Sequence, residues 1–555
     1  MDLTAEEDAL GDWPRRLLHV PTLTSYEWQP GNTYNGMRSP TYNVITYTWG
    51  RYRLGEQERL DVHAVPIIID GGHWDIPRID PDHFTAEEFE KAIRMAGTFT
   101  SPPTPVPVEF LWLDVACIDQ RDGEPRSAAE IGRQGVIFRG ACKVFVWLTS
   151  LDRPRLDETL KGAYGKNSAD DPDPSQIYHM ISLFSDPWFS SLWTLQEACL
   201  RGEGALLLSR DGSLIAQPSA ISSEFTDYFE FGWLCYISTR WHYNCKEVLF
   251  YEAEPNVEVY QEFIDVLADK GLYHIYTRNE LAMYEAAQRR VTLRPEDRIY
   301  GIQQIFGFRV GKSALSTPPD RDFTIEELED QFGEQMLLHY PVLSQFHCFT
   351  QYVPAAKRWR FRKESRMLPI SLMGTTRTSV TSNVSNGSCS FWVDYSVSGK
   401  KPVVWKGLIT SLRAIKRAWD HLLSEDVFLK LDPPMKSLGD GRQDGMINIL
   451  LDRVEELASI HESNDDIMAE TYLQLEELYP NQGLKILFLG PPHSRDLNMM
   501  AGLLLTKGSD LDWVRLGICH WSVPYWTELE CTAMASLSGQ GDIWKQSQGM
   551  FGYLS

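Results

Sequence analysis

Residues 42–48 read YNVITYT, a run of β-branched and aromatic residues that ends at Trp49-Gly50. Residues of these types favour strands, and near-continuous apolar character is typical of a strand buried on both faces of a sheet. Two later runs share the pattern, Phe110–Asp114 (FLWLD) and Val144–Leu148 (VFVWL). We therefore expect three strands of a mostly parallel sheet.

Segments with helical spacing lie between and after these strands. Ala129–Ala141 places apolar residues on neighbouring faces of a helix, and Gln176–Ser185 and Trp193–Leu200 have helical patterns too. Ala205–Leu208 is a further strand candidate. Strands that alternate with helices predict an α/β fold, in which helices cover both faces of a mostly parallel sheet.

The pattern changes beyond about residue 220. Asn256–Lys270 and Thr277–Val291 are amphipathic, and we expect a further helix over Pro295–Phe306. We divide the chain into an α/β domain, a helical extension and a mixed α/β C-terminal region, over residues 1–215, 216–345 and 346–555.

Further elements are predicted towards the C-terminus. Thr324-Ile-Glu-Glu327 has the pattern of a capping box that opens a helix. Gly445–Ser459 is predicted to be helical, whereas Lys485–Leu489 and Ala501–Thr506 resemble strands. These helices and strands are the basis for expecting a mixed α/β region.

The composition limits the classes of protein to which the chain can belong. Apolar residues make up 43% of its 555 residues, which is a globular balance. The 76 acidic and 53 basic residues give a formal net charge of −23, which disfavours binding to a phosphate backbone. The longest apolar runs are far shorter than the roughly 20 residues of a membrane-spanning helix. Nine scattered cysteines without a CxxC pair indicate a reducing compartment. We expect a cytoplasmic protein without nucleic-acid or membrane partners.

Familiar cofactor and metal motifs fail on their spacing. Gly307-Phe-Arg-Val-Gly311-Lys-Ser313 has three residues between its glycines where a P-loop needs four. His242-Tyr-Asn-Cys245 has no second pair of ligands at a suitable spacing. Cys117 has no nearby histidine that would activate it as a nucleophile. The sequence therefore predicts no metal site and no required cofactor.

Aromatic and polar residues follow the first two predicted strands. Ligands of doubly wound sheets bind beyond the carboxyl ends of the strands, so these residues are candidates to line a cleft. The candidates are Tyr47, Trp49, Gly50, Asp114, Asp119 and Gln120. The alternative is that Trp49 and Trp112 fill the core while Asp114 caps a loop. Both interpretations stay open for Asp114, and core packing is favoured for Trp112.

A third candidate element contains Pro187-Trp188 and Trp193-Thr-Leu-Gln-Glu197. In a helix, Trp193 and Glu197 lie one turn apart on the same face. A carboxylate beside an indole is partly removed from water, which changes its pKa. The alternative is that Glu197 is an acid near a helix N-terminus, stabilised by the helix dipole.

Taken together, the motifs resemble the fungal heterokaryon-incompatibility (HET) domain over roughly residues 40–210, and more loosely over about 290–340. Four blocks occur in order. The first three are Tyr47-x-Trp49-Gly50, Leu111-Trp-Leu-Asp114-x-x-Cys117-Ile-Asp119-Gln120 and Ala141-x-x-Val144-x-x-Trp147-Leu148, and the fourth combines Pro187-Trp188 with Trp193-Thr-Leu-Gln196-Glu197. The segment Pro295-Glu-Asp297-Arg298-Ile-Tyr300-Gly301 resembles a helix that commonly follows in such proteins.

The resemblance implies a fold and a chemistry. HET domains are similar to TIR domains, which have a flavodoxin-like sheet and in some members cleave NAD. In those enzymes the catalytic glutamate lies in a Trp-x-x-x-Glu helix, so the resemblance assigns that role to Glu197. It implies NAD as the substrate, with Tyr47, Trp49 or Trp188 stacking on a ring.

The sequence also departs from the family pattern. Asp186 and Ser191 stand where the family usually has arginines, and Thr149 stands where it has a glycine. Lost arginines weaken phosphate binding or redirect the site if they contacted the substrate, and otherwise remove structural ion pairs.

Three hypotheses about function follow from the resemblance. The first is an intracellular effector of fungal non-self recognition and programmed cell death, in which Glu197 drives NAD glycohydrolysis. The second is a non-catalytic HET module that signals by self-assembly or by binding a partner. The third is an enzyme whose cleft takes another small molecule. For partners, we expect a homo-oligomer formed through the HET domain and an upstream protein trigger of unknown identity.

Overall fold

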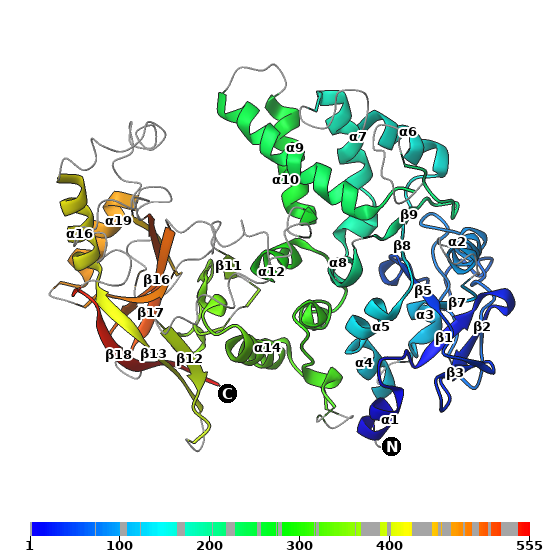
Figure 1. Ribbon diagram of the computed structural model, residues 1–555, viewed down its shortest axis with the longest axis horizontal. Coiled ribbons are helices and arrows are strands. Elements are labelled where there is room, and N and C mark those ends of the chain that lie inside the picture. Colours follow the sequence, from blue (N-terminus) through cyan, green and yellow to red (C-terminus); the bar gives the residue numbers. More distant parts are fainter. Residues whose placement is uncertain are drawn as a thin grey trace. The chain divides into compact units, whose positions relative to one another are not determined.

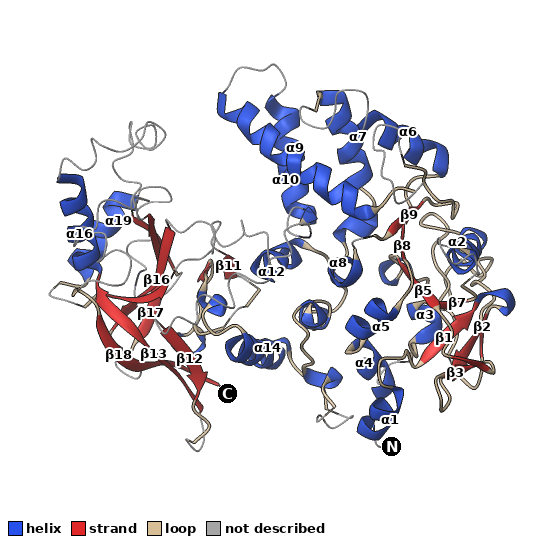
Figure 2. Cartoon of the chain, viewed as in Figure 1, coloured by secondary structure: helices blue, strands red, loops and turns tan. Residues whose placement is uncertain are grey.

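The computed structural model of the chain has two compact units, Met1–Leu328 and Glu329–Ser555 (Figures 1 and 2). It describes residues 3–72, 74–99, 108–121, 124–163, 172–202, 204–217, 228–251, 257–272, 275, 280–315, 317, 321–360, 362–363, 365–367, 389–396, 401–424, 447–452, 457, 468–480, 483–490, 499–508, 512–522 and 542–554. No helix in this part of the chain is long and apolar enough to cross a membrane.

The first unit is built on a mostly parallel seven-stranded sheet in the order β6-β2-β1-β7-β5-β8-β9. Four strands, β5 (Tyr42–Thr46), β7 (Phe110–Trp112), β8 (Val144–Trp147) and β9 (Leu206–Leu208), pair in parallel. All four lie within predicted strands. Their order in space, second-first-third-fourth, is that of a flavodoxin-like sheet, whose switch point lies between β5 and β8.

Three short strands extend this sheet beyond β7. β1 (Arg16–His19) pairs antiparallel with both β7 and β2 (Thr24–Glu27), and β2 pairs in parallel with β6 (Ile68–Ile69). These strands were not expected from the sequence, because two to four residues are too few to establish a period of two. A separate hairpin joins β3 (Thr33–Tyr34) to β4 (Met37–Arg38).

Helices flank the sheet, with α2 on one side of the β5–β7 pair and α4 and α5 on the other (Figure 1). The helices up to β9 are α1 (Leu3–Leu10), α2 (Ala86–Thr98), α3 (Asp114–Cys117), α4 (Pro125–Ile131), α5 (Gln134–Gly140), α6 (Arg153–Ala163), α7 (Pro174–Phe184) and α8 (Leu192–Arg201). The prediction of one helix over Ala129–Ala141 is wrong, because Gly132 caps α4 and Arg133 leaves helical geometry before α5 begins.

The rest of the first unit is helical. It contains α9 (Phe231–Tyr251), α10 (Val257–Lys270), α12 (Glu280–Arg289), α13 (Asp297–Tyr300) and the start of α14 (Ile325–His339). The helix expected over Pro295–Phe306 is instead α13 followed by a 3₁₀ turn, η4 (Gln303–Ile305). Gly301 ends α13, where an added Cβ would lie 2.8 Å from the Asp297 carbonyl oxygen. The capping box is confirmed, since Thr324 and Glu327 bond reciprocally.

The second unit is built on an antiparallel sheet with the order β12-β13-β15-β16-β17-β14, and β18 pairs with β13. Its strands are β12 (Cys389–Val393), β13 (Lys401–Ser411), β14 (Ile447–Leu451), β15 (Lys485–Gly490), β16 (Met499–Thr506), β17 (Val514–Ser522) and β18 (Lys545–Leu554). The unit also contains α16 (Leu412–Ser424), α19 (Met468–Leu478) and a hairpin of β10 (His347–Phe349) and β11 (Ser365–Met367).

The two strands predicted in this unit are confirmed as β15 and β16, but the helix predicted over Gly445–Ser459 is wrong. Ile447-Asn-Ile-Leu-Leu451 forms β14 and pairs with β17. A short apolar run fits a helix or a strand equally well, and the pairing partner decides between them.

Candidate functional site

Asp114 accepts hydrogen bonds from two of the predicted aromatic residues, at the carboxyl ends of β5 and β7. The Tyr47 hydroxyl donates to Asp114 Oδ1 at 2.8 Å, and the Trp49 indole Nε1 donates to Oδ2 at 2.5 Å. The backbone N–H of Val115 donates to Oδ1 at 2.7 Å. Parallel strands end at the same edge of the sheet. Tyr47 and Trp49 therefore meet Asp114 here, although they precede it by 67 and 65 positions in the sequence. Asp114 thus both begins α3 and fixes the two side chains.

The Glu197 carboxyl group lies at the carboxyl end of β5. Glu197 is only 7% exposed and accepts a hydrogen bond at Oε2 from the hydroxyl of Thr46, the last residue of β5. The Trp188 indole Nε1 in turn donates to Thr46 Oγ1 at 2.9 Å. These three side chains form a continuous hydrogen-bonded chain from Trp188 through Thr46 to Glu197. Thr46 was not among the predicted site residues, although it directly precedes Tyr47.

Burial raises the pKa of both acids in this cluster. The pKa of Glu197 lies well above its usual value, mainly because of burial and also because of the Asp114 charge, while the Thr46 hydrogen bond opposes the shift. Burial likewise raises the pKa of Asp114, against the hydrogen bonds from Trp49 and Tyr47. The Asp114 charge therefore disfavours ionisation of Glu197. We name Thr46, Tyr47, Trp49, Asp114 and Glu197 the acidic-aromatic cluster.

His83 joins the ends of β5 and β8 at the switch point of the sheet. Its Nε2 lies 2.7 Å from the Thr48 carbonyl oxygen and its Nδ1 lies 3.2 Å from Thr149 Oγ1. The ring stacks on Tyr52 with 3.7 Å between the centroids. Burial lowers the pKa of His83 to about 4, so the ring is neutral near pH 7. No residue near His83 in the sequence indicates that it belongs to the site, because its partners Thr48 and Thr149 are distant along the chain.

The positions that depart from the family pattern have structural partners. Thr149 contacts His83, as described above. Asp186 is buried and caps the 3₁₀ turn η3 (Pro187–Ser190), accepting the N–H groups of Ser150 at 2.8 Å and Trp188 at 2.9 Å. The Ser191 carbonyl oxygen accepts a hydrogen bond from Arg290 Nη1 at 3.0 Å.

Two arginines from elsewhere in the chain bind the segment before α8. Arg290 also donates to the Trp188 carbonyl oxygen at 3.2 Å. Arg51 Nη2 donates to the Pro187 carbonyl oxygen and to Ser190 Oγ, both at 3.0 Å. The segment that leads to Glu197 is therefore held by guanidinium groups that the spacing of motifs did not reveal.

The side chains of the remaining predicted residues have partners other than the side chains of this cluster. Trp193 shares a cavity of about 350 Å³ with Asp297 and Tyr300. Asp119 pairs with Arg121 at 2.6 Å. The Gln120 side chain donates to backbone carbonyl oxygens, including that of Asp114 at 3.1 Å.

Gly50 and Trp188 also have well-defined places. Gly50 opens the 3₁₀ turn η2 (Gly50–Tyr52) and is partly exposed. The Trp188 ring is completely buried, with edge-to-face contacts to Phe189 and Phe231. Trp188 can thus position Thr46 but presents no open ring face.

Among the residues that the structure describes, no group of three or more histidine, cysteine, aspartate or glutamate side chains is arranged to hold a metal ion. The residues Gly311–Ser313 form a 3₁₀ turn in which Ser313 bonds to Val310.

A family model described as "Heterokaryon incompatibility protein (HET)" matches residues 42–197. The match begins with the first residue of β5 and ends at Glu197, so it contains the whole acidic-aromatic cluster. Searches among curated proteins and among solved structures found no match. The family match supports a role in heterokaryon incompatibility. Residues 42–197 of this chain are therefore similar to the heterokaryon incompatibility (HET) family.

Proposed function

We propose that the protein is an intracellular effector of heterokaryon incompatibility and cell death, and that its TIR-like HET domain hydrolyses NAD at the acidic-aromatic cluster. The observation that carries the proposal is the position of the Glu197 carboxyl group. It lies beyond the carboxyl end of a central parallel strand, within the electrostatic influence of Asp114. Sheets of this kind bind nucleotides at that edge.

The proposed reaction breaks the bond between the nicotinamide nitrogen and C1′ of the ribose. The bonding electron pair leaves with nicotinamide, and water adds at C1′ and releases a proton, giving nicotinamide and ADP-ribose. The positive charge that develops on the ribose is stabilised by a nearby carboxylate, as in glycosidases. Glu197 supplies that carboxylate.

Trp49 is the aromatic residue best suited to stack on a substrate ring. It is partly exposed, whereas Tyr47 and Trp188 are buried. The hydrogen bond from its indole to Asp114 fixes the orientation of the ring. Stacking on a fixed indole costs little conformational entropy, which favours a productive orientation of the substrate.

Ionisation of Glu197 has to accompany catalysis, because only the charged form stabilises the developing cation. In the free protein its raised pKa favours the neutral form. The nicotinamide ring of NAD is positively charged, so its arrival favours the carboxylate. We therefore expect the rate of NAD hydrolysis to increase with pH as Glu197 loses its proton.

NAD consumption by the purified full chain tests the proposal, with and without a crowding agent that promotes self-assembly. Glu197→Gln keeps an oxygen acceptor for Thr46 but removes the charge, so we expect roughly a 100-fold loss of activity or more. Glu90→Gln removes a carboxylate from α2, which lies outside the cluster, and we expect it to retain full activity. Absence of NAD turnover in every assembly state would exclude this reaction for the isolated protein.

A non-catalytic signalling module is the second candidate function. The observation that favours it is the closed chain of Trp188, Thr46 and Glu197, in which the carboxyl group has a structural partner. Such a module would act by self-assembly or through an upstream protein. Cell death that persists in Glu197→Gln, with cellular NAD unchanged, would favour this function over hydrolysis.

A further inference from the structure

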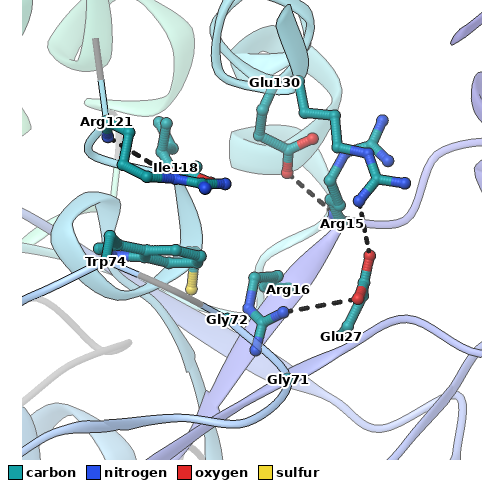
Figure 3. A pocket seen from close by; sticks show the side chains of 12 residues that line it. Arg15, Arg16, Glu27, Gly71, Gly72, Trp74, Ile118, Arg121 and Glu130 are labelled. Atoms are coloured by element: carbon teal, nitrogen blue, oxygen red, sulfur yellow. Dashed lines mark hydrogen bonds and ion pairs between the residues drawn. The ribbon is translucent and has the colours of Figure 1, made fainter. Parts of the chain in front are cut away.

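A second cavity of the first unit, of about 250 Å³, is lined by an unusual number of arginines (Figure 3). Its wall contains Arg15, Arg16, Arg121 and Arg126, together with the indole of Trp74. Figure 3 shows Arg121 and Trp74 on one side, Arg15 and Glu27 on the other, and Arg16 between them. A net charge of −23 makes this concentration of guanidinium groups notable, since it opposes the charge of the whole chain.

Arg16 is held in the wall of this cavity by several hydrogen bonds. Its Nε donates to Ser25 Oγ at 3.1 Å, and its Nη2 donates to the carbonyl oxygens of Ser25 at 2.7 Å and Asp70 at 2.5 Å. The guanidinium lies over Trp74, 5.3 Å from the ring centroid. Nη1 is 3.7 Å from Glu27, beyond hydrogen-bond distance. Arg16 therefore presents one nitrogen in a fixed position to the cavity.

Arg15 carries buried donors without a partner. The residue is 8% exposed and pairs with Glu6 through Nη1 at 2.7 Å, but its Nε and Nη2 have no hydrogen-bond acceptor. Arg126 also pairs with Glu6, at 2.8 Å, and its buried Nε lacks an acceptor. Buried guanidinium donors without acceptors are costly, so an additional acceptor at this place stabilises the fold.

The carboxyl groups of the cavity leave room for such an acceptor. Glu27 is only loosely paired, at 3.5 Å from Arg126 and 3.7 Å from Arg16, and its side chain is partly exposed. Asp119 is engaged by Arg121. Glu130 uses Oε1 to accept the Arg15 backbone N–H at 2.9 Å. Glu27 thus fills, incompletely, the position that a better anion would take.

We propose that this cavity is a binding site for a phosphate group. Phosphate offers several strong acceptor oxygens to the free donors of Arg15, Arg16 and Arg126, and guanidinium groups match its geometry. The volume is below the roughly 300–1,000 Å³ of sites for drug-sized ligands, so it suits a single phosphate group and not a whole dinucleotide. The proposal does not depend on NAD hydrolysis at Glu197.

The short helix α3 connects the cavity to the acidic-aromatic cluster. Asp114 at the start of α3 binds Tyr47 and Trp49, whereas Cys117 at its end lines the cavity, as do Ile118 and Asp119. The helix is a single turn long. An anion in the cavity therefore contacts the segment that also carries Asp114.

Calorimetric titration of the full chain with inorganic phosphate tests the site. Arg121→Ala removes a half-exposed positive charge from the wall and leaves Asp119 without this partner, and both changes disfavour an anion. We therefore expect phosphate affinity to fall about tenfold. Glu27→Gln removes the competing carboxylate, so we expect tighter binding. Arg94→Ala is the control, because Arg94 has nearly the same exposure as Arg121 and is also salt-bridged, to Glu90, but lies on α2. We expect this variant to bind phosphate as the wild type does.

A parallel titration with adenosine monophosphate distinguishes free phosphate from the phosphate group of a larger ligand. Tighter binding than that of inorganic phosphate, lost in Arg121→Ala, would assign an organic phosphate, and equal affinities would assign the free ion. Absence of saturable binding of either probe would overturn the proposal. Equal loss of affinity in Arg94→Ala and Arg121→Ala, or no gain in Glu27→Gln, would overturn it as well.

Discussion

At the scale of single residues, the buried Glu197 carboxyl group gives the first unit a distinctive dependence on pH. Its pKa is raised above its usual value of 4.5, so the folded state binds the proton more tightly than the unfolded chain. Stability is therefore fully present below about pH 4.5 and falls as pH rises towards the pKa of the folded state. Each unit of pKa elevation corresponds to about 1.4 kcal/mol.

Replacing Glu197 by Gln removes this proton-linked cost. We expect Glu197→Gln to gain stability over the wild type above about pH 4.5, with the difference growing as pH rises towards the pKa of Glu197 in the folded state. Urea unfolding of both proteins at several pH values measures the effect. A difference that is constant across this range would mean that Glu197 titrates normally.

Thr46 provides a second test at the same scale, because its hydroxyl group favours the ionised form of Glu197. Thr46→Val keeps the shape of the side chain but leaves Trp188 Nε1 and Glu197 without this partner. We expect a loss of about 1–3 kcal/mol in stability. We also expect the pH profile of NAD hydrolysis to move to higher pH. An unchanged profile would show that the hydrogen bond does not tune the acid.

At the scale of elements, the turn η3 depends on the cap that Asp186 provides. Its carboxylate accepts two backbone N–H groups, from Ser150 and Trp188, and so joins the end of β8 to the start of η3. We expect Asp186→Ala to destabilise the first unit by about 1–2 kcal/mol, as for other lost caps. Thermal unfolding followed by circular dichroism measures the loss, and a variant as stable as the wild type would contradict the assignment.

Elements were predictable where the sequence has a long, consistent pattern. The four parallel strands follow from near-continuous apolar runs, and the start of α14 follows from its capping box. The failures occur where a partner distant in sequence decides the structure. The segment Ile447–Leu451 becomes a strand because β17 pairs with it, and Gly301 ends α13 beside Leu192 of α8.

The candidate site was predictable in the same partial way. Tyr47, Trp49 and Asp114 meet because their strands are parallel neighbours, which the α/β pattern implies. Trp193 and Glu197 lie one turn apart in α8, as the helical pattern implies, and Trp193 also lines a cavity with Asp297 and Tyr300. His83 was not predictable, since its partners Thr48 and Thr149 follow different strands.

At the scale of the whole molecule, the second unit contains its own buried ion pair. Arg515 Nε lies 3.0 Å from Asp452 Oδ2, and both side chains are fully buried between β17 and the end of β14. Asp452 also accepts the Phe349 N–H at 2.8 Å. Removing one charge of such a pair leaves the other without compensation, which is strongly destabilising.

We therefore expect Asp452→Asn to lower the stability of the second unit by about 3–5 kcal/mol. Calorimetry of the full chain should show one transition shifted to lower temperature and the transition of the first unit unchanged. A single shifted transition would instead show that the two units unfold together.

Arg290 has a consequence for how the protein can be divided. It lies almost a hundred residues beyond the last residue of the family match, yet it binds the carbonyl oxygens of Trp188 and Ser191. Gln304 similarly donates its backbone N–H to Gln196 Oε1 at 2.9 Å. A fragment cut where the family resemblance stops would strip these partners from the segment that presents Glu197. The segment that the family model matches is thus shorter than the segment of this chain that holds Glu197 in place.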